Sequence, residues 1–304
     1  MRKAIVVAVL AALVTAGIAE ARPGGRLRER LASRAEAAAQ APLPGATTIA
    51  YGRDPLQTLD IWTAKDAGAR APLIVFVHGG GWKRGSKDNA TGRFKPVHYP
   101  EQGIAFASIN YRLVPANTVE EQAADVASAV AALQARAGEL GIDPDRIVLM
   151  GHSAGAHLVA LVGTNPQFLD TAGVPRGAIR GIVPIDGAAY DVAAQMAQAG
   201  RFMGKTYTQA FGQDPARQRA LSPTLHAGGW DAPRFLLLYV QRADGVAQAR
   251  ALGAALAAAG SVVEHGSFPG EGLKGHAEIN RSLGDPAYAA TAPVDAWLRA
   301  TFGG

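Results

Sequence analysis

The chain has 304 residues, enough for one large domain or two modest ones with a substantial core. Hydrophobic residues make up 48% and charged residues 18%, and this composition excludes an intrinsically disordered protein. Lys and Arg outnumber Asp and Glu by 30 to 25 but form no long basic run, so no nucleic-acid partner is predicted. The absence of cysteine excludes disulfides, zinc–thiolate and iron–sulfur sites, and a cysteine nucleophile.

Residues 1–21 have the pattern of a secretory signal peptide. Arg2 and Lys3 precede an uncharged apolar run, and small residues at Ala19 and Ala21 fit a cleavage site after Ala21. The apolar run covers 16 residues, fewer than the ~20 that span a bilayer, so a signal peptide is favoured over a membrane anchor. We expect a mature chain without a membrane span that is exported to the periplasm or secreted.

The pattern of short strands begins after an Arg- and Ala-rich stretch, 22–45, which is interpreted as an N-terminal arm. The folded domain is therefore expected over 46–304. Two short runs at its start, 47–52 and 56–64, fit an antiparallel hairpin at a sheet edge. Later apolar runs bounded by Gly or Pro are typical of strands buried on both faces. These runs are 73–77, 104–109, 146–150, 179–185, 235–240 and 261–264.

Helical periodicity occupies intervals between these strands, at 119–138, 154–162 and 246–259. The alternation of strand and helix predicts an α/β fold, with a mostly parallel sheet and helices on both faces. The interval 188–229 lies between two predicted strands and is too long for an ordinary connection. It is interpreted as an inserted helical cap.

A G-x-S-x-G motif, GHSAG at 151–155, lies between a predicted strand and a predicted helix. In that context the serine occupies a strained turn with its hydroxyl exposed, because the glycines carry no side chains to crowd it. Ser153 is therefore predicted to be a nucleophile. His152 within the motif and His157 on the helix are interpreted as packing residues.

A second glycine-rich motif, HGGGW at 78–82, follows the predicted strand 73–77. Consecutive glycines let backbone N–H groups point at a developing oxyanion, where each donor is worth ~3–4 kcal/mol. The predicted donors are the N–H groups of Gly80, Gly81 and Ala154. The ring of His78 is expected to hydrogen-bond backbone and support this loop. Trp82 either lines the substrate pocket or belongs to the core.

These motifs, with SINYRL at 108–113 and LSPTLHA at 221–227, resemble the α/β-hydrolase fold. Within that fold the chain is similar to carboxylesterases of the hormone-sensitive-lipase and arylformamidase-like branch, over roughly residues 47–298. The resemblance implies a serine hydrolase of small-molecule carboxylic esters that needs no cofactor. The predicted signal peptide makes it an exported enzyme, and the small predicted cap favours short acyl chains. The spacing of the histidines and carboxylates indicates no metal site. A hydrolase of formamides or other small amides is one alternative, and an inactive binding member of the fold is another. The oligomeric state stays open.

The order serine, acid, histidine in this fold restricts the base to histidines after Ser153. His276 is expected in a loop beyond the last strand and is predicted to be the base. His265, at the end of the last predicted strand, is the reserve. His226 fits poorly, because it precedes the strand after which this family carries its acid.

Asp244 is predicted to be the acid of the triad. It follows the predicted strand 235–240, and one helix and one strand separate it from His276, as the fold requires. The family usually has a histidine–glycine pair just ahead of this acid, where the present chain has Val240-Gln241. Asp186, directly after the predicted strand 179–185, is the alternative, because some hydrolases carry the acid one strand earlier.

Overall fold

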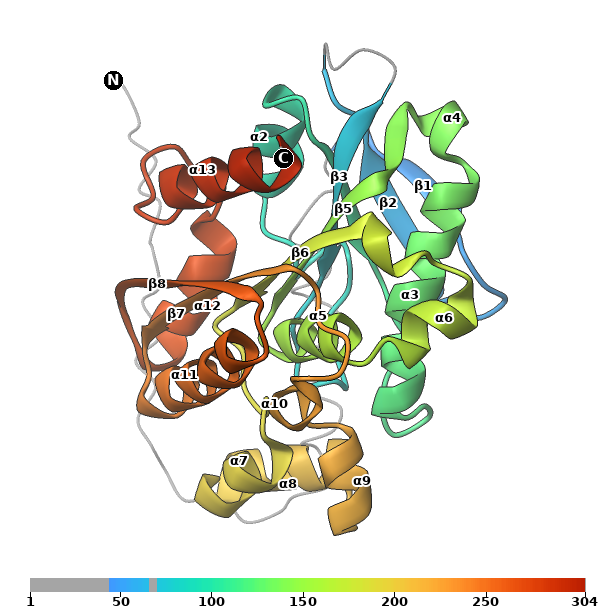
Figure 1. The fold of residues 1–304 in the computed structure, drawn as a ribbon. Helices are drawn as coiled ribbons and strands as arrows, with labels where there is room; N and C mark the ends of the chain where they lie inside the picture. Colours follow the sequence, from blue (N-terminus) through green and yellow to red (C-terminus); the bar gives the residue numbers. More distant parts are fainter. Residues whose placement is uncertain (1–43, 66–69, 304) are drawn as a thin grey trace, which may run out of the picture. The chain divides into compact units, whose positions relative to one another are not determined.

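The computed structural model describes residues 44–65 and 70–303. The predicted signal peptide and nearly all of the predicted N-terminal arm lie outside these ranges. The described part contains an eight-stranded sheet (Figure 1). Its strands are β1 Thr47–Ala50, β2 Thr58–Trp62, β3 Ala71–Val77, β4 Ala105–Ile109, β5 Ile142–His152, β6 Ile179–Ile185, β7 Arg234–Gln241 and β8 Val262–Glu271.

The strands are ordered β1-β2-β4-β3-β5-β6-β7-β8 across the sheet. β2 pairs antiparallel with β1 and with β4, and every pairing from β4 to β8 is parallel. The predicted hairpin and the mostly parallel sheet are thus confirmed. The central strands read as apolar runs because both of their faces are covered, whereas the edge strand β8 is largely exposed.

Helices cover both faces of the sheet and divide the core into two clusters (Figure 1). The side chain of Val75 on β3 enters one cluster, and that of its neighbour Phe76 enters the other, because successive side chains of a strand point to opposite faces. Val75 shares its cluster with α3 Val119–Ala135, α5 Ala154–Thr164 and α11 Ala243–Ala258. Phe76 shares its cluster with α2 Lys95–Glu101, α12 Gly272–Ser282 and α13 Thr291–Phe302.

Helix α3 begins with a capping box. The Thr118 hydroxyl accepts the backbone N–H of Glu121, and the Glu121 carboxylate accepts the backbone N–H of Thr118. This capping box satisfies two N–H groups that would otherwise lack partners at the helix start. The shorter helices are α4 Ala137–Leu140, α6 Gln167–Ala172 and η1 Arg176–Ala178.

The chain between β6 and β7 is helical, as the predicted insertion 188–229 requires. It forms α7 Val192–Gln198, α8 Arg201–Phe211, α9 Pro215–Ala220 and α10 Pro223–His226. These helices gather at one end of the sheet (Figure 1). Arg217 on α9 forms an ion pair of 2.7 Å with Glu120 on α3, which ties the insertion to the rest of the domain.

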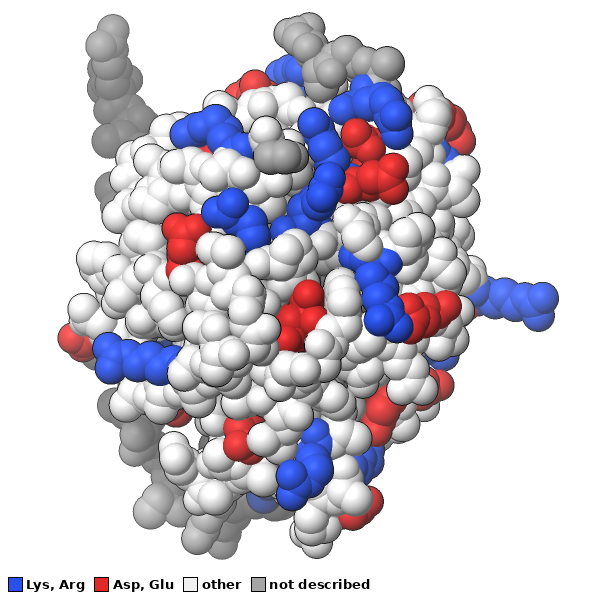
Figure 2. All heavy atoms as spheres, in the orientation of Figure 1, with Lys and Arg blue, Asp and Glu red and all other residues white. Residues whose placement is uncertain are grey.

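Lys and Arg side chains lie beside Asp and Glu side chains over much of the face in Figure 2. Among the helices of residues 44–65 and 70–303, none has the length and apolar character needed to cross a bilayer.

Candidate active site

Ser153 occupies the turn between β5 and α5. Its φ of 56° and ψ of −115° lie in a region that non-glycine residues rarely adopt, so the predicted strained turn is confirmed. A Cβ atom at Gly151 would lie 2.3 Å from the carbonyl oxygen of Gly155, and a Cβ atom at Gly155 would lie 2.1 Å from that of Val77. Both glycines of the motif are therefore required by close backbone packing around the serine.

The glycine loop after β3 packs directly against this turn. A Cβ atom at Gly79 would lie 3.0 Å from the Cβ atom of Ser153. The next two residues, Gly80 and Gly81, have φ angles of 132° and 61°, which glycine adopts without strain. Ala154 is the first residue of α5, where backbone N–H groups have no partner within the helix. The three predicted donor residues therefore all lie next to the contact between the loop and Ser153.

His78 supports the glycine loop through its backbone, as predicted. Its Nδ1 donates to the carbonyl oxygen of Gly79 at 2.7 Å, and its ring stacks on that of Tyr111 with centroids 4.3 Å apart. The Tyr111 hydroxyl donates in turn to the carbonyl oxygen of His78 at 3.0 Å. Burial lowers the pKa of His78 to about 4, so the ring is neutral at pH 7.

Trp82 belongs to the core between the glycine loop and the inserted helices. It is 2% exposed, and its ring lies 4.7 Å from that of Phe211 and 5.9 Å from that of Tyr207, both on α8. His157 of α5 completes this aromatic cluster at 5.5 Å, and its Nε2 donates to the carbonyl oxygen of Leu221 at 2.8 Å. The cluster fixes α8 directly over the glycine loop.

His276 lies on α12 and not in a loop, so that part of the prediction is wrong. β8 continues to Glu271 and α12 begins at the next residue. The rings of His276 and His152 have centroids 4.5 Å apart, and His152 Nε2 donates to the carbonyl oxygen of His276 at 2.9 Å. Because His152 directly precedes Ser153, these contacts bring His276 to the turn that carries the serine. Burial and the neighbouring His276 hold the pKa of His152 well below its usual value.

Asp186 is the carboxylate in contact with His276. Its Oδ2 lies 2.5 Å from His276 Nδ1, and its side chain is 0% exposed. Asp186 directly follows β6 and has a φ of 43°. Its backbone N–H donates to the carbonyl oxygen of Leu238 at 2.7 Å, and its Oδ1 accepts from the N–H of Val240 at 3.3 Å. The backbone of β7 therefore holds this carboxylate in place.

The prediction that the Asp244 carboxylate contacts His276 is wrong. β7 ends at Gln241 and α11 begins at Ala243, so only one residue separates the strand from the helix. Asp244 consequently lies in the first turn of α11 and not in a loop that could reach across to His276. Its carboxylate accepts from Arg242 Nη2 at 3.3 Å and from Gln195 Nε2 at 3.4 Å, and its side chain is 43% exposed.

The residue between β7 and α11, Arg242, is part of the site, although the sequence analysis did not single it out. Its Nη1 lies 2.7 Å from His276 Nδ1 and 3.3 Å from Asp186 Oδ2. Its side chain is 12% exposed. The one sequence signal near it was Val240-Gln241 in place of the family's histidine–glycine pair.

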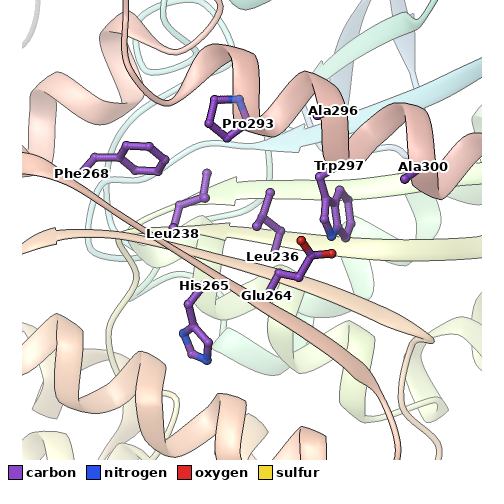
Figure 3. A pocket seen from close by; sticks show the side chains of 10 residues that line it. Leu236, Leu238, Glu264, His265, Phe268, Pro293, Ala296, Trp297 and Ala300 are labelled. Atoms are coloured by element: carbon purple, nitrogen blue, oxygen red, sulfur yellow. The ribbon is translucent and has the colours of Figure 1, made fainter.

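The two other candidate histidines lie elsewhere. His226 Nε2 on α10 donates to the carbonyl oxygen of Ala220 at 2.8 Å. His265 on β8 packs edge-on against Tyr239 and points away from Trp297 (Figure 3). It lines a cavity of about 270 Å³ between β7, β8 and α13. Within the described ranges, neither histidine forms an ion pair with a carboxylate, and no group of three acidic or histidine side chains is arranged to hold a metal ion.

Comparisons with known proteins agree with this architecture. The model of the BD-FAE family matches residues 59–215, more than half of the chain. The chain belongs to the BD-FAE family. Among solved structures, esterase B from Lactobacillus Rhamnosis superposes with a TM-score of 0.71 at 22% identity over 92% of both chains. Native esterase Est2 from Thermogutta terrifontis has a TM-score of 0.65 at 25% identity over 85% of this chain and 93% of that one. The predicted α/β-hydrolase fold is confirmed.

Curated relatives of the chain carry the names of esterases. A probable isoprenylcysteine alpha-carbonyl methylesterase, ICMEL1 of Arabidopsis thaliana, is 37% identical over 37% of this chain and 23% of its own. Esterase LipC of Mycobacterium tuberculosis is 37% identical over 42% of this chain and 32% of its own. Esterase LipQ of the same organism is 32% identical over 72% of this chain and 53% of its own. The chain thus spans about a quarter of ICMEL1, about a third of LipC and about half of LipQ. The predicted resemblance to α/β-hydrolase carboxylesterases is confirmed.

Proposed function

We propose that the chain is a serine hydrolase of carboxylic esters, with Ser153 as nucleophile, His276 as base and Asp186 as acid. The observation that carries the proposal is the contact of 2.5 Å between the buried Asp186 carboxylate and His276 Nδ1, next to the turn of Ser153. A carboxylate on Nδ1 favours the tautomer that leaves Nε2 free to accept a proton. The esterase names of the relatives in both comparisons support an ester as the substrate.

In the proposed reaction, His276 Nε2 takes the proton of the Ser153 hydroxyl as its oxygen attacks the ester carbonyl carbon. The tetrahedral intermediate collapses when the carbon–oxygen bond to the alcohol breaks, and the same imidazole protonates the departing alcohol. A water molecule then attacks the acyl-serine by the same route and releases the carboxylic acid. Asp186 stabilises the imidazolium that forms in each half of the reaction.

The N–H groups of Gly80, Gly81 and Ala154 are proposed to bind the oxyanion of the intermediate. The φ angles of the two glycines and the free N–H at the start of α5 support this role. Each donor lost from such a site costs ~3–4 kcal/mol of transition-state stabilisation. The helix N-terminus adds a favourable partial positive charge for a developing anion.

Short acyl chains are the proposed preference. Trp82, Tyr207 and Phe211 fill the space between the glycine loop and α8, and a Cβ atom at Gly81 would lie 3.1 Å from the Thr206 side chain. This packing of α8 against the loop supports a short acyl site beside the predicted oxyanion donors.

Turnover of p-nitrophenyl esters from acetate to palmitate, by the wild type and by Ser153→Ala, tests the proposal. We expect the highest kcat/KM with the short esters and loss of turnover in Ser153→Ala. Ser128→Ala, the same substitution on α3, is the matched control and should retain wild-type turnover. Labelling by a p-nitrophenyl phosphonate, read by peptide mass spectrometry, should modify Ser153. Equal turnover in the wild type and Ser153→Ala would contradict the proposal, and faster hydrolysis of formanilides than of esters would favour the small-amide alternative.

Export is the second part of the proposal, and it rests on the sequence of residues 1–21. We propose that the chain is cut after Ala21 and released to the periplasm or outside the cell. Intact-mass measurement of the protein from the periplasmic and culture fractions should give a mature chain that begins at Arg22. A full-length chain retained in the membrane fraction would contradict cleavage.

A further inference from the structure

We infer that Arg242 and Asp244 form a positioning pair behind the Asp186–His276 contact, in which Asp244 draws the guanidinium away from the imidazole. Nη1 of Arg242 faces His276 and Asp186, and Nη2 faces Asp244 at 3.3 Å. The inference rests on the proposed function, because it concerns the histidine proposed as the base.

A guanidinium and a carboxylate compete for the same imidazole nitrogen. Arginine has donors only, so its Nη1, 2.7 Å from His276 Nδ1, can bind that nitrogen only when Nδ1 carries no proton. Asp186 Oδ2, 2.5 Å from the same nitrogen, binds it through a proton on Nδ1. The first state places the proton of a neutral imidazole on Nε2, which then cannot accept the proton of Ser153. The second state leaves Nε2 free.

The position of Asp244 decides which state is favoured. Its carboxylate and Asp186 Oδ2 each lie 3.3 Å from a terminal nitrogen of Arg242. Together they offer the guanidinium two charged acceptors, which bind it more strongly than a neutral imidazole nitrogen does. Asp244, which was predicted to be the acid, therefore acts on His276 through Arg242.

The guanidinium also compensates the burial of Asp186. A carboxylate with a fully buried side chain is costly unless it is paired and hydrogen-bonded. Asp186 accepts hydrogen bonds from His276 Nδ1 and from the backbone N–H of Val240. It also forms an ion pair with Arg242.

A double-mutant cycle with Arg242→Met and Asp244→Asn tests the inference. In the wild-type background, Asp244→Asn should lower kcat for p-nitrophenyl acetate by about twofold to tenfold with little change in KM, because the released guanidinium donates to Nδ1. In the Arg242→Met background the same substitution should have little effect, since methionine has no donor. Equal effects in the two backgrounds would refute the coupling.

Arg250→Met is the matched control background for this cycle, because Arg250 lies on α11 and lines the same surface hollow of about 470 Å³ as Arg242. In that background Asp244→Asn should lower kcat as much as it does in the wild type.

An unchanged kcat in Asp244→Asn in the wild-type background, with folding intact by circular dichroism, would also overturn the inference. Failure of the proposed function is distinguishable, because it would appear as undiminished turnover in Ser153→Ala, which this cycle does not contain.

Discussion

Asp186→Asn should nearly abolish ester turnover. The replaced carboxylate has a side chain that is 0% exposed and lies 2.5 Å from His276 Nδ1. An amide at this position can donate to Nδ1, and Arg242 Nη1 at 2.7 Å becomes free to do the same. Both changes favour the tautomer with the proton on Nε2. The same substitution in the template serine–histidine–aspartate triad lowers kcat by ~10⁴, or ~5 kcal/mol.

Steady-state kinetics with p-nitrophenyl acetate, at a pH on the plateau of the wild-type profile, measure this loss. Asp244→Asn is the matched control: it makes the same chemical change at a carboxylate that is 43% exposed and does not contact His276. Its loss should not exceed about tenfold. Urea unfolding of both variants should verify that they are folded. A loss of ~10⁴ in Asp244→Asn, with Asp186→Asn close to wild type, would refute the assignment of the acid.

Three further predictions follow from the fold and the site. His276→Ala should lower kcat by several orders of magnitude, whereas His265→Ala should stay within tenfold of wild type in the same assay. Gly155→Ala should lower the free energy of unfolding by ~1–3 kcal/mol or more, because its Cβ would lie 2.1 Å from a backbone carbonyl oxygen of β3. Gly138→Ala should not lower it, because a Cβ atom there would lie in open space. Urea unfolding measures both variants. Burial lowers the pKa of His157 from 6.5 to about 4, so the unfolded chain binds more protons between these values and stability falls as the pH falls through this window. From pH 7 to pH 5, His157→Gln should therefore lose ~2 kcal/mol less of unfolding free energy than the wild type does, and an equal loss would contradict a neutral buried His157.

The buried strands could be predicted from the sequence because parallel strands covered on both faces consist of apolar runs. β6 was expected at 179–185 and occupies Ile179–Ile185. β8 is longer than expected, because it lies at the sheet edge and most of its residues are exposed. An exposed edge strand needs no apolar run, so its polar half carried no signal.

The two C-terminal helices were missed for different reasons. In α13, Val294, Trp297, Leu298 and Thr301 are buried at helical spacing, so the periodicity was present in the sequence. In α12, only Gly275, Ile279 and Asn280 are buried. One glycine, one asparagine and a single large apolar residue on the buried face give no recognisable stripe.

The choice between the two candidate acids could not be made from chain order. Both Asp186 and Asp244 lie between Ser153 and His276 and follow a core strand. The decisive fact is the length of the β7–α11 connection, a single residue. That length depends on where the strand ends and the helix begins, and such boundaries are the least certain part of any prediction from sequence. The glycine motifs were easier to interpret, because close backbone packing around Ser153 admits no other residue at 151 and 155.

Polar contacts, which hydrophobic periodicity does not reveal, position the helix that carries His276. The buried ammonium of Lys95 donates to the backbone oxygen and, at 3.0 Å, to the Oδ1 of Asn280, one turn beyond His276. Asn280 Nδ2 donates to the carbonyl oxygen of Ala90 at 2.9 Å, and His152 Nε2 donates to that of His276.

A buried ammonium is costly to place in a core, and burial lowers the pKa of Lys95 to about 7. Its hydrogen bonds to Thr91 and Asn280 and its position 4.9 Å from the centre of the Phe76 ring offset part of that cost. Apolar burial alone would leave α12 free to shift along the sheet, because its buried face is small. Directional hydrogen bonds to its backbone and to Asn280 fix its register, and with it the position of the His276 ring relative to Asp186 and Ser153.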